Sequence, residues 1–488
     1  MKKQQNKVDR STVGKLALFI LCSVLCLNTA QAQCHWLRGT VSCEGCGIKD
    51  VVVTDGVTSV KTDDKGEYAI QTMIEEGFVY ITTPAGYLTE VVDKTIPQFY
   101  QKLEKGKDRY DFELIKNKVD DSKHVFFVHS DVQATSKEDL RNYKPILEDC
   151  KNLISTYEDV DVFGFDCGDV VGDTPSLFGT YIDVVSELDK PIYRAIGNHD
   201  MDYYGRTHET SARTFSSLFG PRYFSFDKGK AHYIVINNNF FFGRDYFYMG
   251  YIDEKTFLWL EQDLANVPEG TLVFFIMHIP GRLTDKREPF QYNYDLIANP
   301  TVNFEALASI LKPYDAHIIS GHMHYNLNIL HAPNLYEHNT AAICGTWWRG
   351  DICTDGTPQG YAIYEVDDKD VKWYYKSSGF PKEYQFKAYP VGASEEYPND
   401  IIVNVWNYDP LWKVEWLENG EVKGQMTKYT GFDPDAKALC SDKDKVKYDW
   451  ISPSKNEHMF RATPKNSNSQ IKIRVTDRFG QVYMAEVK

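Results

Sequence analysis

The middle of the chain, residues 119–345, alternates short apolar runs with helical segments, and this alternation constrains the fold most strongly. Each run is rich in β-branched and aromatic residues and has the length of a buried strand. After Asp253, the side chains of Phe257, Leu260 and Leu264 recur at helical spacing. Strands and helices in alternation build α/β domains, so the sequence predicts that class here. The expected strands span 124–129, 160–165, 191–196, 232–237, 271–277 and 316–320.

Most of these expected strands are followed directly by side chains that bind metal ions. The segments concerned are Ser130–Gln133, Gly168–Asp173, Gly197–Asp200, His278–Gly281 and Gly321–His324. In an open α/β sheet, the carboxyl ends of the strands share the edge where sites form. Carboxylates, amides and imidazoles together suit one or two divalent cations. Any one segment could be an ordinary turn, but their repetition after successive strands predicts a metal site.

The order of these segments resembles the calcineurin-like metallophosphoesterase family, whose pattern is Asp-x-His, Gly-Asp, Gly-Asn-His-Asp/Glu, His and Gly-His-x-His. The match covers residues 119–345, and Phe219–Asp227 and Trp259–Leu264 also fit it. The resemblance implies an α/β (α+β) sandwich of two β-sheets flanked by helices, with the metals at one sheet edge. It also implies hydrolysis of a phosphate ester by metal-activated water.

The family's residue roles carry over to matching positions of this chain. Asp131, Gln133 and His324 would hold one metal, Asn198, His278 and His322 the other, and Asp169 would bridge both. His199 stands beside a ligand and would act on the leaving oxygen as the catalytic residue. The resemblance thus implies two divalent ions, drawn from Mn, Fe, Zn, Mg or Ca.

Two positions depart from the family's pattern. Gln133 stands where most members have His, and an amide oxygen is a harder and weaker ligand than imidazole. Gly172 stands where a carboxylate that orients the catalytic His often sits, and Asp173 is the nearest substitute. The first metal site is therefore expected to be the looser one.

Several other residues have both a structural and a functional interpretation. His129 and His317 lie within or beside strands and are expected to be structural. Arg282 could contact a substrate phosphate or be a solvated loop residue. Trp347 and Trp348 could cover the pocket or attach the C-terminal domain, and the second interpretation is favoured. The segment with Tyr203, Tyr204 and His208 could line the cleft.

The blocks on either side of residues 119–345 have strand patterns and few helical signals. In residues 33–118, runs of period two are separated by Asp-Gly and Lys-Gly turns, which predicts a small β-sandwich similar to transthyretin-like modules. Residues 346–488 are expected to form a β-rich C-terminal domain, with strands at 360–366, 371–375, 400–406 and 471–475. Both blocks resemble domains that accompany exported bacterial members of the family.

The N-terminus has the pattern of a secretory signal peptide over residues 1–32. Basic residues precede the apolar run 16–27, and Ala30-Gln31-Ala32 is a small-x-small cleavage site. The run is too short to span a bilayer. The protein is therefore expected in the periplasm or outside the cell. Lipid attachment at Cys34 is less favoured because Gln33 is a poor residue before a lipidated Cys.

The net charge bears on the class of partner, and the cysteine spacing bears on whether the chain has a zinc site or a disulfide. The formal net charge of −15 argues against a nucleic-acid polymer as partner. The Cys43-Glu-Gly-Cys46 segment could be half a zinc site, but a local disulfide or free thiols are favoured because no second such pair lies nearby.

The expected function is that of an exported, dinuclear metal-dependent phosphatase or phosphodiesterase. Its substrate would be a small nucleotide, sugar phosphate or lipid head group. A nucleotide-sugar pyrophosphatase is an alternative within the same chemistry. A non-catalytic envelope- or carbohydrate-binding protein with a vestigial metal site is the alternative from another class. The sequence indicates no oligomeric state.

Overall fold

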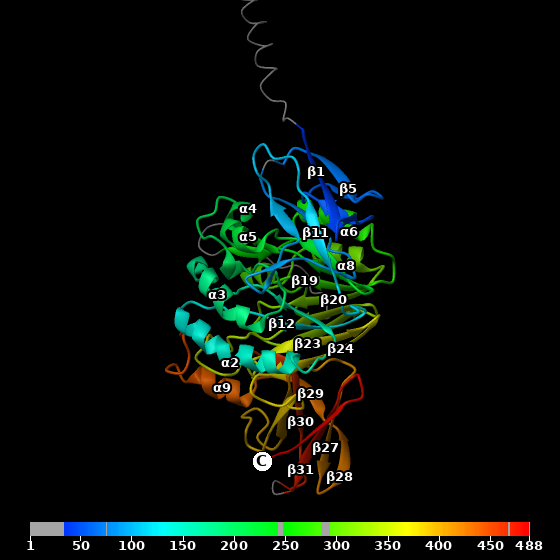
Figure 1. The fold of residues 1–488 in the computed structure, drawn as a ribbon. Coiled ribbons are helices and arrows are strands. Elements are labelled where there is room, and N and C mark those ends of the chain that lie inside the picture. The colour runs from blue at the N-terminus through cyan, green and yellow to red at the C-terminus, as the bar shows by residue number, and fades with distance from the viewer. Residues whose placement is uncertain (1–33, 75, 243–246, 285–292, 467–468, 488) are drawn as a thin grey trace, which may run out of the picture.

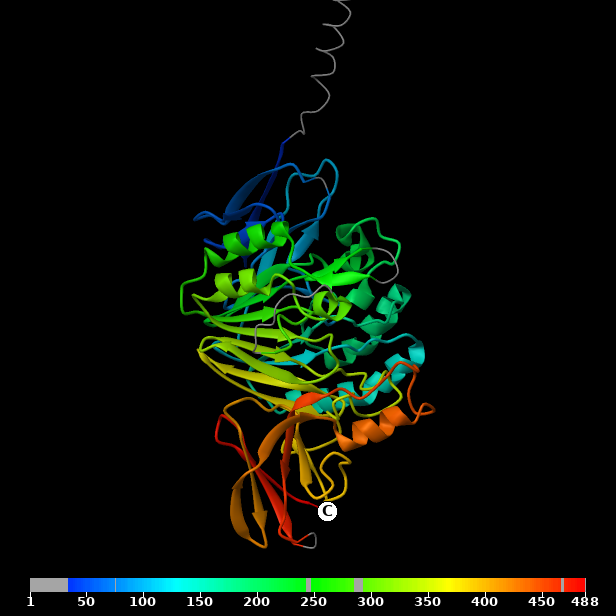
Figure 2. The same ribbon diagram turned by 180° about the vertical axis from the view of Figure 1, so that it is seen from behind.

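The computed structural model describes residues 34–74, 76–242, 247–284, 293–466 and 469–487, so the predicted signal peptide lies outside the described residues. Three regions follow one another along the long axis of the molecule (Figure 1). The N-terminal region lies at one end, the α/β region in the middle and the C-terminal region at the other end, an arrangement that Figure 2 shows from behind.

The N-terminal region consists of two small sheets with a shared core. Strand β1 (His35–Cys43) pairs antiparallel with β5 (Glu67–Thr72) and parallel with β11 (Phe112–Lys116). In β5 every second side chain is buried, the period expected of a sheet with one face on a core. The second sheet has the order β10-β6-β3-β4. The other strands here are β2 (Cys46–Gly47), β3 (Val52–Thr54), β4 (Ser59–Lys61), β6 (Phe78–Ile81), β7 (Tyr87–Leu88), β8 (Val91–Val92), β9 (Ile96–Pro97) and β10 (Tyr100–Lys102).

The middle region contains two larger sheets. The first has the order β14-β13-β12-β23-β24 and the second β15-β16-β19-β20-β22-β21. The strands of the first are β12 (Lys123–His129), β13 (Asp161–Asp166), β14 (Ile192–Arg194), β23 (Gly360–Asp367) and β24 (Asp370–Ser377). Those of the second are β15 (Phe224–Lys228), β16 (Ala231–Val235), β19 (Leu272–Ile276), β20 (Asp315–Ser320), β21 (Leu327–Ala332) and β22 (Leu335–Asn339).

Alternate side chains of β12 show how the two sheets form a sandwich. Val125 and Phe127 belong to the core shared with the helices, whereas Phe126 and Val128 belong to the core between the sheets. The Phe126 ring meets the edge of Phe274 in β19 at a centroid distance of 4.9 Å. Because both faces of β12 are covered, its apolar run is continuous, as in other buried parallel strands.

Helices cover the outer faces of this sandwich (Figure 1). Those that pack against the first sheet include α2 (Lys137–Ile154) and α3 (Phe178–Val185). Near the second sheet lie α6 (Glu254–Leu264) and α8 (Phe304–Leu311). Asp253 caps α6 by accepting a hydrogen bond from Thr256 N, so the helix begins where the sequence predicts. The remaining short elements are α4 (His208–Ser211), α5 (Arg213–Phe219), α7 (Tyr294–Ala298), β17 (Asn239–Phe241) and β18 (Tyr248–Gly250), with 3₁₀ turns at Pro175–Leu177, Ser186–Leu188 and Asn198–Asp200. The predicted sandwich of two sheets flanked by helices is confirmed.

Two strands of the block 346–488 belong to the first sheet of the middle region. Strands β23 and β24 were expected in the C-terminal domain, but β23 pairs antiparallel with β12 and extends the first sheet. The alternation within these strands is equally compatible with either sheet, so the local sequence does not reveal their partner.

The C-terminal region is a second β-sandwich with its own core. Its sheets have the orders β25-β26-β30-β29 and β28-β27-β31-β32, and the core includes Val403, Trp412 and Ile473. The elements are β25 (Phe386–Tyr389), β26 (Ile401–Val405), β27 (Lys413–Glu418), β28 (Glu421–Gln425), β29 (Thr427–Gly431), α9 (Pro434–Ser441), β30 (Asn456–Ala462), β31 (Ile471–Thr476) and β32 (Val482–Glu486).

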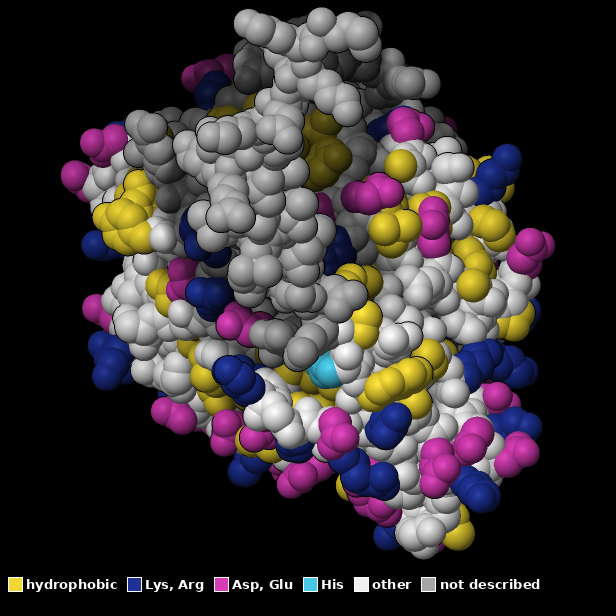
Figure 3. All heavy atoms as spheres, turned by 90° about the horizontal axis from the view of Figure 1, so that it is seen from above, with side chains coloured by type: hydrophobic (Ala, Val, Ile, Leu, Met, Phe, Trp, Pro, Cys, Tyr) yellow, Lys and Arg dark blue, Asp and Glu magenta, His cyan; other side chains and the backbone are white. Residues whose placement is uncertain are grey.

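The surface charges, the cysteines and the helix lengths each give one further observation. In the face seen in Figure 3, the described Lys and Arg side chains are interspersed with Asp and Glu. The cysteines of the described residues are free thiols, and Cys43 lies opposite Cys46 across β1 and β2. No helix among the described residues is long and apolar enough to cross a bilayer.

Candidate metal centre

Loops at the carboxyl ends of the central strands bring the predicted ligands together. Asp131 follows β12, Asp169 follows β13 and Asn198 follows β14, and these three strands are parallel. His278 and His322 follow β19 and β20, which are also parallel to each other. Parallel strands end at a common edge, so residues far apart in the sequence meet there.

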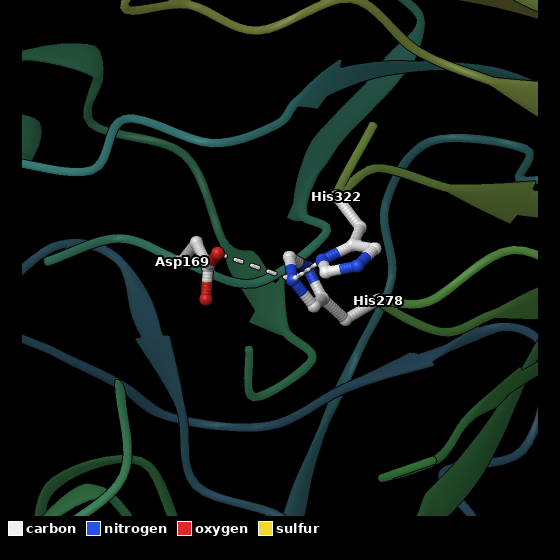
Figure 4. Close-up of side chains that lie close together, drawn as sticks. All are labelled: Asp169, His278 and His322. Carbon is white, nitrogen blue, oxygen red and sulfur yellow. Dashed lines mark hydrogen bonds and ion pairs between the residues drawn. The ribbon is translucent and has the colours of Figure 1, made fainter. Parts of the chain in front are cut away.

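The tightest cluster surrounds the imidazole of His278. Its Nε2 lies 3.2 Å from Asp169 Oδ2, 3.1 Å from Asn198 Oδ1 and 3.2 Å from His322 Nδ1. Figure 4 shows Asp169, His278 and His322 pointing toward one another. His278 Nδ1 lies 2.7 Å from the carbonyl oxygen of Cys167, which accepts its proton. In the neutral ring, this contact keeps the proton on Nδ1. The Nε2 atom then carries a lone pair that faces the other ligand atoms.

A second cluster lies around Asp131. His324 Nε2 is 3.4 Å from Asp131 Oδ1. The backbone N–H of His322 donates to Asp131 Oδ2 at 2.9 Å, which joins the two clusters. Ser130 also donates its hydroxyl proton to Asp131.

Gln133 lies beside these clusters. Its backbone N–H donates to the Asp169 carbonyl at 2.7 Å, and its side chain is buried. The buried Oε1 has no hydrogen-bond partner among the described residues. Because a buried amide oxygen without a partner is costly, it signals a ligand at this position.

The backbone of the site is strained. Non-glycine residues with positive φ are uncommon, and such strain clusters at functional sites. Positive φ angles occur at Asp131 (50°), Gln133 (42°), Asp169 (52°), His322 (71°) and His324 (56°). Gly197 permits a close approach as well, because a Cβ there would lie 2.0 Å from Asp169 Oδ1.

The buried charged groups of the site favour the binding of cations. Burial alone would raise the pKa of Asp169, but His278 and His199 lower it below its usual range. Burial would lower the pKa of His278, but Asp169 and Asp131 raise it to about 9. Burial and the His278 charge lower the pKa of His322 to about 3. Protons on His278 thus supply positive charge that divalent cations could supply instead.

His199 borders the cluster and keeps some solvent contact. Its backbone N–H donates to Asp169 Oδ1 at 2.8 Å, and its Nδ1 lies 2.7 Å from Asp173 Oδ1. The side chain is 30% exposed, unlike His278, which is fully buried. Burial alone would lower the pKa of His199, but Asp169 and Asp173 raise it above its usual value.

Comparison with protein families identifies this arrangement. The family "Calcineurin-like phosphoesterase" matches residues 124–326. The families "N terminal of Calcineurin-like phosphoesterase" and "C terminal of Calcineurin-like phosphoesterase" match residues 35–117 and 337–483, respectively. The chain belongs to the calcineurin-like phosphoesterase family. Curated protein sequences gave no match.

Solved structures similar to this calcineurin-like phosphoesterase include two phosphatases and a nucleotidase. A dimetal phosphatase from Danio rerio is 12% identical over 52% of this chain and 96% of its own, with a TM-score of 0.38. A purple acid phosphatase from yellow lupin (Lupinus luteus) is 14% identical over 68% and 67%, with a TM-score of 0.37. A 5'-nucleotidase from Candida albicans is 12% identical over 54% and 53%, with a TM-score of 0.32.

The family implies two divalent ions, and the donors of this calcineurin-like phosphoesterase fit them. Three ligand atoms, from Asp169, Asn198 and His322, lie within 3.2 Å of His278 Nε2. Asp169, His278 and His322 also place one ligand atom each within 4.8 Å of one another. Together with the Gln133 oxygen, these atoms form a donor set for hard to borderline cations.

Other residues weighed from the sequence have structural contacts. His129 is buried and its Nδ1 pairs with the Tyr143 hydroxyl at 2.6 Å. His317 is buried, with its Nδ1 2.9 Å from His338 Nε2. Arg282 forms an ion pair with Glu305. His208 pairs with Asp253 at the start of α6, at 2.9 Å.

His324 has two neighbours outside the predicted ligand set, and sequence reasoning missed the first of them. Cys344 Sγ lies 3.7 Å from its Nδ1. The Trp347 ring stacks on the imidazole at a centroid distance of 4.5 Å and an angle of 22°. Trp347 also contacts Trp450 in the C-terminal region, so it combines the two roles considered from the sequence. No local motif marks these contacts, since they depend on how separate segments pack.

Proposed function

We propose that this protein is an exported phosphoesterase that hydrolyses a phosphomonoester or phosphodiester bond of a small phosphorylated molecule. The single observation that carries the proposal is the convergence of the Asp169, Asn198, His278 and His322 side chains beside His199. The chain's membership of the calcineurin-like phosphoesterase family supports it.

The proposed ligand assignment follows the two clusters. Asp131, Gln133 and His324 would hold one ion, Asn198, His278 and His322 the other, and Asp169 both. Two divalent ions in such sites supply Lewis acidity for water attack on phosphorus and for neutralising phosphoryl oxygens. The Cys167 carbonyl keeps the His278 proton on Nδ1, so that Nε2 stays available as a ligand.

His199 is the proposed proton donor. The Asp173 carboxylate fixes the imidazole through Nδ1, which leaves Nε2 as the atom that can reach a substrate. Asp169 and Asp173 favour the protonated ring. The partly exposed imidazolium is therefore suited to give its Nε2 proton to the departing alcohol oxygen.

One assay tests the proposal. The purified full chain is analysed for bound metals and then assayed with p-nitrophenyl phosphate and bis(p-nitrophenyl) phosphate. Activity that disappears on chelation and returns with a divalent ion is expected. Preference for one ester separates phosphatase from phosphodiesterase, and a screen of phosphorylated metabolites, with nucleotide-sugars included, separates both from a pyrophosphatase. A metal-loaded protein that cleaves none of these compounds supports the non-catalytic alternative and overturns the proposal.

Export is proposed from the N-terminal sequence. Its test is expression with a C-terminal tag, followed by cell fractionation and N-terminal sequencing. A mature chain that begins at Gln33 in the periplasm or medium is the expected result. A full-length chain in the cytoplasm contradicts it.

A further inference from the structure

An aromatic cluster stands next to the metal centre, where the middle region meets the C-terminal region. It consists of Trp347, Tyr448 and Trp450 and is named the aromatic wall below. Trp347 lies against His324 with one face, and the Trp450 ring meets it edge-on at a centroid distance of 4.8 Å. Tyr448 and Trp450 are nearly parallel, at 8° and 5.5 Å. Trp347 therefore touches a proposed metal ligand, and Trp450 is two ring contacts away from it.

A polar contact holds this segment over the site loops. Lys447 Nζ donates to Thr135 Oγ1 at 2.6 Å and pairs with Asp139 at 3.2 Å. Thr135 lies beside Gly172, in the loop that leads to Asp173. Burial raises the pKa of Tyr448 above its usual value, and the negative charges of Asp139 and Asp173 add to this shift.

Two features of the aromatic wall and of the adjacent Trp348 lower the stability of the fold. Trp347 and Trp348 are consecutive residues with positive φ, 52° and 65°, which costs about 1–2 kcal/mol per residue. The Trp450 side chain is 63% exposed, although Trp is among the residues that gain most from burial. A strained backbone that holds one ring on His324, next to a second ring left open to solvent, indicates a binding surface.

We infer that Trp450 binds the alcohol part of the substrate by stacking, with Trp347 and Tyr448 as positioning residues. The substrate class is then a phosphate ester whose alcohol carries a ring that can pack on an indole, either the plane of a nucleobase or the C–H face of a sugar. This inference rests on the proposed phosphoesterase function. The phosphate would occupy the metal centre, and the ring would lie on the open face of Trp450.

The first test measures binding without turnover, by calorimetry on the metal-loaded full chain. The probes are phenylphosphonate and methylphosphonate, whose carbon–phosphorus bonds are not hydrolysed. Stacking of a ring on an aromatic side chain predicts that Trp450→Ala weakens phenylphosphonate binding by about 5- to 150-fold and leaves methylphosphonate binding unchanged. Trp450→Phe should retain most of the affinity. Trp36→Ala is the matched control, because Trp36 is also exposed but belongs to β1 of the N-terminal region.

The second test measures hydrolysis of adenosine 5'-monophosphate and glucose 6-phosphate. Trp450→Ala should raise KM with little change in kcat, whereas damage to the metal centre would lower kcat. A raised KM for the nucleotide alone assigns a nucleobase, and a raised KM for glucose 6-phosphate alone assigns a sugar ring.

The possible failures are distinguishable. If wild type binds methylphosphonate and cleaves esters, but Trp450→Ala changes neither phenylphosphonate binding nor either KM, the aromatic wall is not a substrate site and the proposed function stands. If the metal-loaded wild type binds neither phosphonate and cleaves no ester, the proposed function fails, and the inference fails with it.

Discussion

Two contacts join His199 and Asp173, one between their side chains and one between their backbones. His199 Nδ1 lies 2.7 Å from Asp173 Oδ1, and the Asp173 backbone N–H donates to the His199 carbonyl at 3.0 Å. Asp173 has a φ of 56°, so the loop bends to bring this carboxylate toward His199. The residue before it is Gly172, at the position where the family often has the orienting carboxylate. The contact that the sequence suggested only weakly is thus present.

Asp173→Asn should lower kcat by about 10- to 100-fold, the usual effect of removing the partner that orients a functional imidazole. The physical reason is that an amide neither fixes the tautomer nor favours the protonated ring. The measurement is kcat against pH with bound metal determined in parallel.

His199→Ala should lower turnover by about 10²–10⁴-fold with metal content near normal. Adding Asp173→Asn to His199→Ala should then cost little more, because Asp173 acts through His199. Full additivity of the two changes would show that Asp173 has another role, and loss of metal in His199→Ala would make His199 a ligand.

Asp169→Asn should remove both metals and all measurable activity while the fold is retained. A neutral amide gives up the negative charge that the proposed bridging position requires, and Asp169 Oδ2 lies 3.2 Å from His278 Nε2. Metal content, activity and circular dichroism are measured on the same preparation. Full metal content with retained activity would refute the dinuclear assignment.

Gln133→His should tighten the first metal site and shift its preference toward Zn²⁺ or iron over Mn²⁺ or Ca²⁺. Imidazole nitrogen is a softer and stronger donor than the buried Gln133 Oε1. In wild type, a chelator should empty this site first. Metal titration of both apoproteins measures the change. Equal affinities and equal preference would place residue 133 outside the metal's ligand set.

His232→Gln should destabilise the protein more at pH 6 than at pH 10. Burial alone would lower the pKa of His232, but the carboxylates of Asp263 and Asp227 raise it to about 10 from a reference of 6.5. The charged ring therefore stabilises the fold fully below about pH 6.5, and this contribution is lost as pH rises through about 10.

Urea unfolding of wild type and His232→Gln at pH 6, 8 and 10 measures this effect. The difference in unfolding free energy is expected to be about 3 kcal/mol at pH 6, as for a broken buried pair, and to shrink toward pH 10. His35→Gln, in β1, is the control with the same change of residue type. A difference that stays constant across this range would mean that His232 is neutral in the folded protein.

The local elements and the ligand segments could be located from the residue pattern alone. Buried strands such as β12 and β19 are short apolar runs, and the N-cap of α6 is Asp253, so local composition and periodicity suffice to locate them. Asp131, Asp169 and Asn198 could be predicted to meet because parallel strands align their carboxyl ends.

Which of the other segments become neighbours depends on the tertiary structure. The partner of β23 is β12, and the ring on His324 belongs to Trp347, which in turn contacts Trp450. None of these pairs is specified by spacing along the chain. Strand pairing and ring packing depend on which buried surfaces fit together once the chain is compact, and that choice is made by the whole core.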